Sequence, residues 1–141
     1  MQIGVEAQRA VENRRVFVID EDEINRAALQ FMLADDNETH ELASVAEALR
    51  KGQVLPPDLV VVGVSLLAKG GAPLLAQLRA AWSRSRLLAM CETSDIACIA
   101  AARQAGADDT LARPLKLETV RRKVDRLLGR PVAVSIPVVA S

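Results

Sequence analysis

The sequence is poor in aromatic residues and carries no net charge. Its 141 residues include two Phe, one Trp and no Tyr, and 18 Lys and Arg balance 18 Asp and Glu. Nucleic-acid-binding domains show an excess of basic residues, so the balanced charge and the pI near 6.6 argue against that class. Half of the residues are hydrophobic, which excludes a disordered chain. The core must therefore be built from aliphatic side chains.

Cysteines and long hydrophobic runs are also scarce. Cys91 and Cys98 are the two cysteines; they are too few for a disulfide scaffold and do not form a CxxC pair, a pattern that suits a reducing compartment. The longest apolar stretch, 59–68, is interrupted by a glycine and a serine and is far too short to span a membrane. Residues 1–15 lack the apolar segment of a secretory signal. We therefore expect a cytoplasmic protein that contacts neither membrane nor nucleic acid.

What is present is an alternation of short apolar runs with segments of helical periodicity, over a length that suits one domain. The predicted strands are 16–19, 39–43, 59–62, 87–90 and 109–112. The predicted helices are 23–33, 45–51, 72–82, 95–105 and 115–128. Five strands alternating with five helices favour an α/β fold, a doubly wound five-stranded parallel sheet with helices on both faces.

The pattern also predicts how some elements begin, end and pack. Gly70 and Gly71 interrupt the chain before the helix at 72–82, and Ser94 or Asp95 is expected to cap the helix that follows. Trp82 is either a packing plug or an exposed anchor for an interface. The helix at 23–33 places a set of apolar residues on one stripe: Ile24, Ala27, Ala28, Phe31 and Met32. The last helix is expected to turn a similar set inward: Leu117, Val120, Val124 and Leu127.

In doubly wound sheets the working site lies at the carboxyl ends of the strands. The residues found there are Asp20, Glu21 and Asp22 after the first strand, Gly63 and Ser65 after the third, Cys91 and Glu92 at the fourth, and Arg113 and Pro114 at the fifth.

Three segments together resemble one known family. They are Val16-Phe-Val-Ile-Asp-Glu-Asp-Glu-Ile-Asn25, Pro57-Asp-Leu-Val-Val-Val62 and Ala105-Gly-Ala-Asp-Asp-Thr-Leu-Ala-Arg-Pro114. In order and spacing they are similar to the receiver domain of response regulators, over about residues 15 to 129. The resemblance implies a flavodoxin-like fold with strand order 2-1-3-4-5. It divides the chain into an N-terminal extension at 1–14, a receiver-like domain at 15–129 and an apolar tail at 130–141.

In that family an acidic pair holds Mg²⁺, and an Asp ending the third strand takes phosphate from a kinase histidine. A Thr or Ser and a Lys bind the phosphoryl group, and an aromatic side chain rotates to report it. Here Asp20 and Glu21 match the acidic pair. At the other positions this chain departs from the family: Gly63 replaces the acceptor Asp, Cys91 the Thr or Ser, Thr110 the aromatic residue and Arg113 the Lys. The resemblance therefore implies a degenerate phosphorylation pocket, or pseudo-receiver.

The acidic run after the first strand has two readings. Its carboxylates either cap the following helix or bind Mg²⁺ through Asp20 and Glu21, with Ser65 as a further metal candidate. Because Gly63 removes a ligand, the capping role is favoured, and neither a metal nor another cofactor is expected. We also hypothesise that Arg113 forms an ion pair with Asp20 or Glu21 in place of the metal.

These features predict a stand-alone atypical response regulator, not an enzyme, that acts by phosphorylation-independent protein–protein interaction. A histidine kinase or another response regulator is the expected partner. The alternatives are a regulator phosphorylated on a non-standard residue, and a thiol-redox switch at Cys91, whose thiol lies near Arg113; Cys98 is expected to be a core residue. The apolar tail at 131–141 is expected to dock on a second protomer in a homodimer.

Overall fold

The computed structural model describes residues 14–93 and 95–130. Its strands are β1 (Arg14–Ile19), β2 (Asn37–Leu42), β3 (Leu59–Val62), β4 (Arg86–Glu92) and β5 (Asp109–Arg113). Its helices are α2 (Glu23–Leu33), α3 (Val45–Lys51), α4 (Val64–Ala81), α5 (Ile96–Gln104) and α6 (Leu117–Leu127). The predicted α/β alternation is confirmed.

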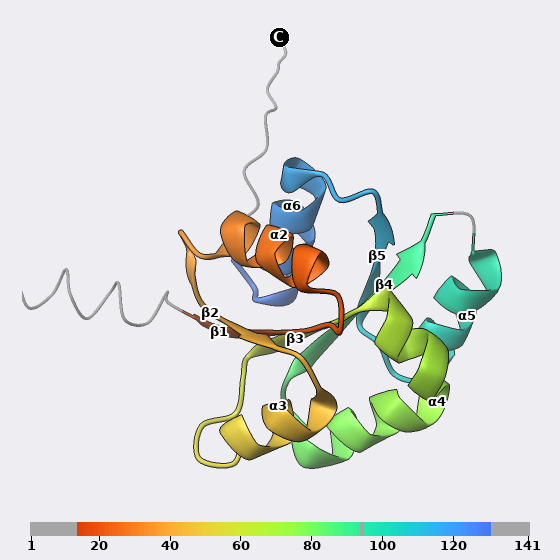
Figure 1. The fold of residues 1–141 in the computed structure, drawn as a ribbon, viewed down its shortest axis with the longest axis horizontal. Helices are drawn as coiled ribbons and strands as arrows, with labels where there is room; N and C mark the ends of the chain where they lie inside the picture. The colour runs from red at the N-terminus through yellow and green to blue at the C-terminus, as the bar shows by residue number, and fades with distance from the viewer. Residues whose placement is uncertain (1–13, 94, 131–141) are drawn as a thin grey trace, which may run out of the picture.

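The strands form one parallel sheet in the order β2-β1-β3-β4-β5. Helices α2 and α6 cover one face of this sheet, and α3, α4 and α5 lie on the other (Figure 1). The flavodoxin-like order 2-1-3-4-5 implied by the resemblance is therefore confirmed. Because the five strands of the described residues run in the same direction, their carboxyl ends meet at one edge of the sheet, which is where a site can form.

The core is aliphatic on both faces of the sheet. All four residues of β3 are fully buried, as are residues 16–19 of β1, which explains why these runs are continuously apolar rather than alternating. Trp82 is 5% exposed and packs edge-on against Phe17, 5.7 Å between ring centroids. It is therefore a packing plug and not an exposed anchor.

Helix α4 begins earlier than predicted. The expected interruption is present, because Gly71 has a positive φ of 55° and bends the helix between its two halves. The residues before the bend, 64–70, are helical as well, although the sequence pattern predicts a helix only from residue 72. The chain thus passes from β3 into a helix with Gly63 as its N-cap and no intervening loop.

Helix α2 has the predicted bounds, but the face it buries was misassigned. Leu29 and Leu33 enter the core, whereas Ile24 is 78% and Phe31 is 81% exposed. Leu117 at the start of α6 is also partly exposed, at 42%, while Val120 and Val124 are buried as expected. The stripe expected to pack inward therefore leaves large apolar side chains in solvent.

The predicted extension at 1–14 falls almost wholly outside the described residues, and so does the apolar tail at 131–141 with its proposed role in a homodimer. In the part of the chain that is described, no helix is long and apolar enough to cross a membrane.

Candidate functional site

The ends of β1 and β3 place Asp20 and Gly63 side by side. Ile19 and Val62 are register partners in the two strands, and the N–H of Gly63 donates to the carbonyl of Ile19 at 2.8 Å. The residue that follows β1 is Asp20, which is 1% exposed. A buried carboxylate therefore lies directly beside a residue with no side chain.

The carboxylate of Asp20 occupies the space that a side chain at position 63 would need. A Cβ atom built on Gly63 would lie 2.3 Å from Cγ and 2.4 Å from Oδ2 of Asp20. Carbon atoms in contact are normally about 3.5–4.0 Å apart. Glycine is thus the residue that this arrangement accepts without displacing Asp20.

Asp20 itself is only partly satisfied by hydrogen bonds. Its Oδ1 accepts from the N–H of Asp22 at 2.9 Å, and its backbone carbonyl accepts from Nη1 of Arg26 at 2.7 Å. Its Oδ2 is buried and has no hydrogen-bond partner. A buried carboxylate oxygen without a hydrogen-bond partner costs free energy of folding, and Oδ2 of Asp20 remains able to accept a hydrogen bond.

The rest of the acidic run caps α2 and pairs with α4. Asp22 is the N-cap of α2, and its Oδ1 accepts from the N–H of Ile24 at 2.9 Å, which confirms the capping role at that residue. Glu21 pairs with Nζ of Lys69 at 2.8 Å, and the Ser65 hydroxyl lies 3.5 Å from the same carboxylate.

The residues present do not fit the Mg²⁺ of the family. That ion needs octahedral oxygen coordination, usually with one or two carboxylates free to ligate. Here Glu21 is turned to Lys69 and Gly63 supplies no side chain, so Asp20 is left as one carboxylate with one free oxygen. Within the described residues, no group of three or more His, Cys, Asp or Glu side chains is placed to hold a metal ion.

Arg113 pairs with Glu92 and not with Asp20 or Glu21, so the hypothesised ion pair is wrong. The reason is the register of the sheet, because Arg113 of β5 is the direct partner of Glu92 in β4. The hydrogen bond to Glu92 raises the pKa of Arg113 above its ordinary value, and the charges of Asp20 and Asp22 add to that rise. The negative charges of the acidic run therefore still stabilise the protonated guanidinium of Arg113.

Cys91 and Cys98 form a disulfide, so the expectation of free thiols is wrong. Cys91 is fully buried near the end of β4, and Cys98 lies in the first turn of α5. Cys98 is thus more than a core residue. A strand end followed by one helical turn is what brings two cysteines seven positions apart within reach.

Thr110 is buried in β5, where it lies beside Ala89 of β4. Its carbonyl accepts from Nζ of Lys123 on α6 at 2.5 Å. A threonine there is small and has no ring that could rotate between two positions.

The structure therefore brings Asp20, Glu21, Gly63 and Ser65 together and sets Arg113 and Cys91 to one side with partners of their own. Sequence reasoning missed two pairings, that of Arg113 with Glu92 and that of Glu21 with Lys69. Glu92 could have been found by aligning β4 with β5, since both strand ends had been assigned. No signal in the sequence pointed to Lys69, because it lies in the part of α4 that had not been recognised as a helix.

Comparisons with known proteins agree with this fold and site position. The family model described as the response regulator receiver domain matches residues 16–125. The chain is 31% identical over 117 residues to response regulator MprA of Mycobacterium ulcerans, covering 82% of this chain and 50% of that protein. It is 30% identical over 121 residues to the transcriptional regulatory protein PrrA of Mycobacterium leprae, covering 85% of this chain and 52% of that protein. The chain thus spans about half the length of both relatives.

Solved structures show the same similarity. A response regulator from Chloroflexus aurantiacus superposes with a TM-score of 0.74 at 25% identity, over 84% of this chain and 99% of that one. A two-component response regulator from Clostridium difficile gives the same TM-score and identity over 84% and 98% of the two chains. Sheet order, matched residues and relatives lead to one conclusion: this chain belongs to the response regulator receiver domain family, a non-enzymatic signalling module of two-component systems.

Proposed function

We propose that this receiver domain acts by binding proteins of two-component signalling and does not accept a phosphoryl group. One observation carries the proposal: the residue that follows β3 is Gly63, and the Asp20 carboxylate fills the space beside it. Phosphoryl transfer to a protein needs a side-chain nucleophile, which glycine lacks. Gly63 stands where the family has its acceptor Asp, but it has no carboxylate that could take up a phosphoryl group.

The neighbouring residues support the same proposal. The sulfur of Cys91 is committed to Cys98 and offers no hydroxyl to a phosphoryl oxygen. The guanidinium of Arg113 is held by Glu92, which neutralises the charge that would face the anion. These contacts turn two phosphate-binding positions of the family toward partners inside the protein.

A surface for a protein partner is available on the other side of the molecule from the disulfide. We define the α2–α6 patch as Ala27, Phe31, Ala34 and Leu117. Its large side chains are exposed, and with its neighbours it lines a hollow of about 620 Å³ between α2 and α6. Contiguous exposed apolar side chains of this kind mark protein-binding sites. A charged rim of Asp35, Glu41 and Arg121 surrounds the hollow.

Family membership implies a histidine kinase as the partner of a receiver domain. We infer that a kinase docks on the α2–α6 patch and keeps its phosphoryl group, so that this domain competes with regulators that are phosphorylated. Another response regulator could occupy the same patch, and the binding experiment separates the two partners.

The experiment measures binding of the full chain to the histidine kinases and to the other response regulators of its own organism, with and without Phe31→Glu. Because exposed aromatic anchors dominate interface energetics, the substitution is expected to weaken binding by about tenfold or more. Val54→Glu introduces the same charge at a side chain that is 93% exposed on the loop after α3, and should bind like the wild type. Both variants should unfold at the same denaturant concentration as the wild type, within error.

Radiolabelled phosphate on the kinase should remain on the kinase in these mixtures. Transfer of label to the receiver, or equal binding by the Phe31→Glu and wild-type proteins, would contradict the proposal. Binding to a response regulator but to no kinase would contradict the kinase as partner. The α2–α6 patch would still be the binding surface if Phe31→Glu weakens that binding.

A further inference from the structure

The Cys91–Cys98 disulfide ties the end of β4 to the first turn of α5. The two Cα atoms are 6.1 Å apart, within the range of about 4.4–6.8 Å found for disulfides. The bond closes a short ring that contains Glu92, which pairs with Arg113, and Asp95, which caps α5 by accepting from the N–H of Cys98 at 2.9 Å. It therefore lies between the strand-end site and a helix on the surface.

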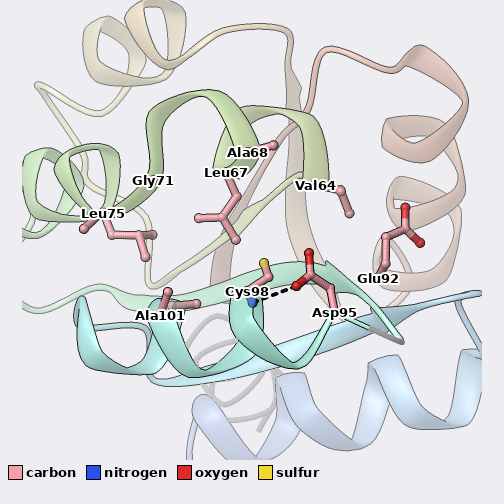
Figure 2. A pocket seen from close by; sticks show the side chains of 11 residues that line it. Val64, Leu67, Ala68, Gly71, Leu75, Glu92, Asp95, Cys98 and Ala101 are labelled. Carbon is pink, nitrogen blue, oxygen red and sulfur yellow. Dashed lines mark hydrogen bonds between the residues drawn. The ribbon is translucent and has the colours of Figure 1, made fainter.

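The two sulfur-bearing residues differ in their access to solvent. Cys91 is fully buried, whereas Cys98 is half-buried and lines a hollow of about 230 Å³ between α4 and α5. Figure 2 shows the Cys98 sulfur directed from α5 into the space between the two helices, facing Leu67. A thiol arriving from solvent can therefore reach Cys98, while Cys91 is shielded.

Few buried side chains hold helix α5 against the sheet. It has nine residues, of which Ala102 alone is buried, whereas Ile96 is 77% exposed. A helix shorter than about 12 residues is marginal in water unless tertiary contacts hold it. The disulfide is a covalent tertiary contact in its first turn.

We propose that Cys91 and Cys98 are a reversible redox site, and that its reduction releases the first turn of α5 from β4. The reductant is a dithiol. One of its thiolates attacks Sγ of Cys98, the disulfide breaks, and the electron pair leaves on Sγ of Cys91, which takes up a proton. The second thiol of the reductant then attacks the mixed disulfide and frees the Cys98 thiol. Two electrons and two protons pass to the protein, and the dithiol becomes a disulfide.

This site is separate from the surface assigned to the protein partner. The α2–α6 patch lies on the opposite face of the sheet from α4 and α5 (Figure 1). Loss of partner binding in Phe31→Glu and loss of redox sensitivity in a cysteine variant are therefore distinguishable failures. What the reduction changes is the wall of the α4–α5 hollow that Cys98 and Asp95 supply.

The test uses the full chain in buffers of graded reduced and oxidised dithiothreitol, followed by an acid quench, alkylation of free thiols in denaturant, because Cys91 is fully buried, and intact mass. The oxidised protein should take up no alkyl group and the reduced protein two, with full recovery on reoxidation. Hydrogen exchange of the unalkylated protein in the same buffers should show amides of residues 96–104 exchanging about tenfold faster after reduction. The reason is that the disulfide no longer limits local unfolding of α5. Amides of α6, which contact neither cysteine, should be unchanged.

Cys98→Ser should show the fast exchange of α5 in both oxidised and reduced buffer, because it removes the bond at its more exposed end. Three results would overturn the proposal. They are two alkylated thiols in the protein taken from oxidising buffer, unchanged exchange of α5 on reduction, and loss of protection in all helices together. The last result would show that the disulfide stabilises the whole domain and not α5 in particular.

Discussion

At the scale of single residues, the site is decided by the pair Gly63 and Asp20. Under the proposed function, Gly63 stands at the acceptor position and supplies no nucleophile, and the carboxylate of Asp20 occupies the space beside it. The position of Gly63 at a strand end could be predicted from the sequence, because strand ends follow from the apolar runs. The placement of the Asp20 side chain could not, since a rotamer depends on which atoms surround it in three dimensions.

Gly63→Ala should destabilise the protein by about 1–3 kcal/mol, because the added Cβ forces the buried Asp20 carboxylate out of its place. The cost should fall well below that in an Asp20→Ala background, where the colliding atoms are absent. Urea unfolding followed by the fluorescence of Trp82, the single tryptophan, measures the four free energies of this double-mutant cycle. Equal costs in the two backgrounds would show that the two residues do not compete for space.

At the scale of elements, the boundaries of helices and strands were easier to predict than their faces. The sequence placed α2 at the correct residues, yet its apolar side chains fall on two stripes, and periodicity alone does not say which one meets the sheet. Leu29 and Leu33 meet it, which leaves Phe31 on the surface. The first half of α4 was missed because a short helix beginning directly after a strand has no loop or polar cap to announce it.

The edge strand β2 is polar, and a charged cluster joins it to β1. Glu38 accepts from Nη1 of Arg15, and its Oε2 lies 2.7 Å from Nε2 of His40. The contact with His40 is the largest cause that lowers the pKa of Glu38 below its ordinary value of 4.5, and Arg15 adds to the effect. A lowered pKa in the folded state means that the ionised form stabilises the fold.

Glu38→Gln should therefore reduce stability above about pH 4.5, where the wild-type carboxylate is ionised in both states. The difference should shrink as the pH falls through the folded-state pKa. Because Glu38 is 41% exposed, solvent screening keeps the difference under about 1 kcal/mol. Urea unfolding of both proteins from pH 7 to pH 3 measures it, and a gap that stays constant over this range would contradict the role given to Glu38.

At the scale of the whole molecule, one sheet separates two surfaces with different chemistry. Helices α2 and α6 with their patch lie on one face, and α4 and α5 with the disulfide lie on the other; Figure 1 shows how the helices divide between the two faces. Asp20 and Gly63 directly follow β1 and β3, at the edge of the sheet where the strands end. Strand order could be predicted from the family resemblance, because three motifs fix where the strand ends lie. The disulfide could not, because cysteine spacing alone does not show that a strand end and a helical turn bring two sulfurs together.

The scarcity of aromatic residues is reflected both in the core and in the candidate site. The core is aliphatic because the sheet is covered on both faces, and Thr110 stands in β5 where the family resemblance implies a rotating aromatic side chain. An exposed Phe31 is then notable, since one of only two phenylalanines lies in solvent on the surface assigned to the partner.

The central claim is that this receiver domain does not accept a phosphoryl group. The most direct measurement is the intact mass of the full chain after incubation with acetyl phosphate and Mg²⁺, beside a receiver domain that retains its acceptor Asp. The account predicts that the control gains the mass of a phosphoryl group and that this chain keeps the mass of its unmodified sequence. A phosphoryl adduct on this chain, whether labile or stable to acid and whether on Ser65 or another residue, would contradict it.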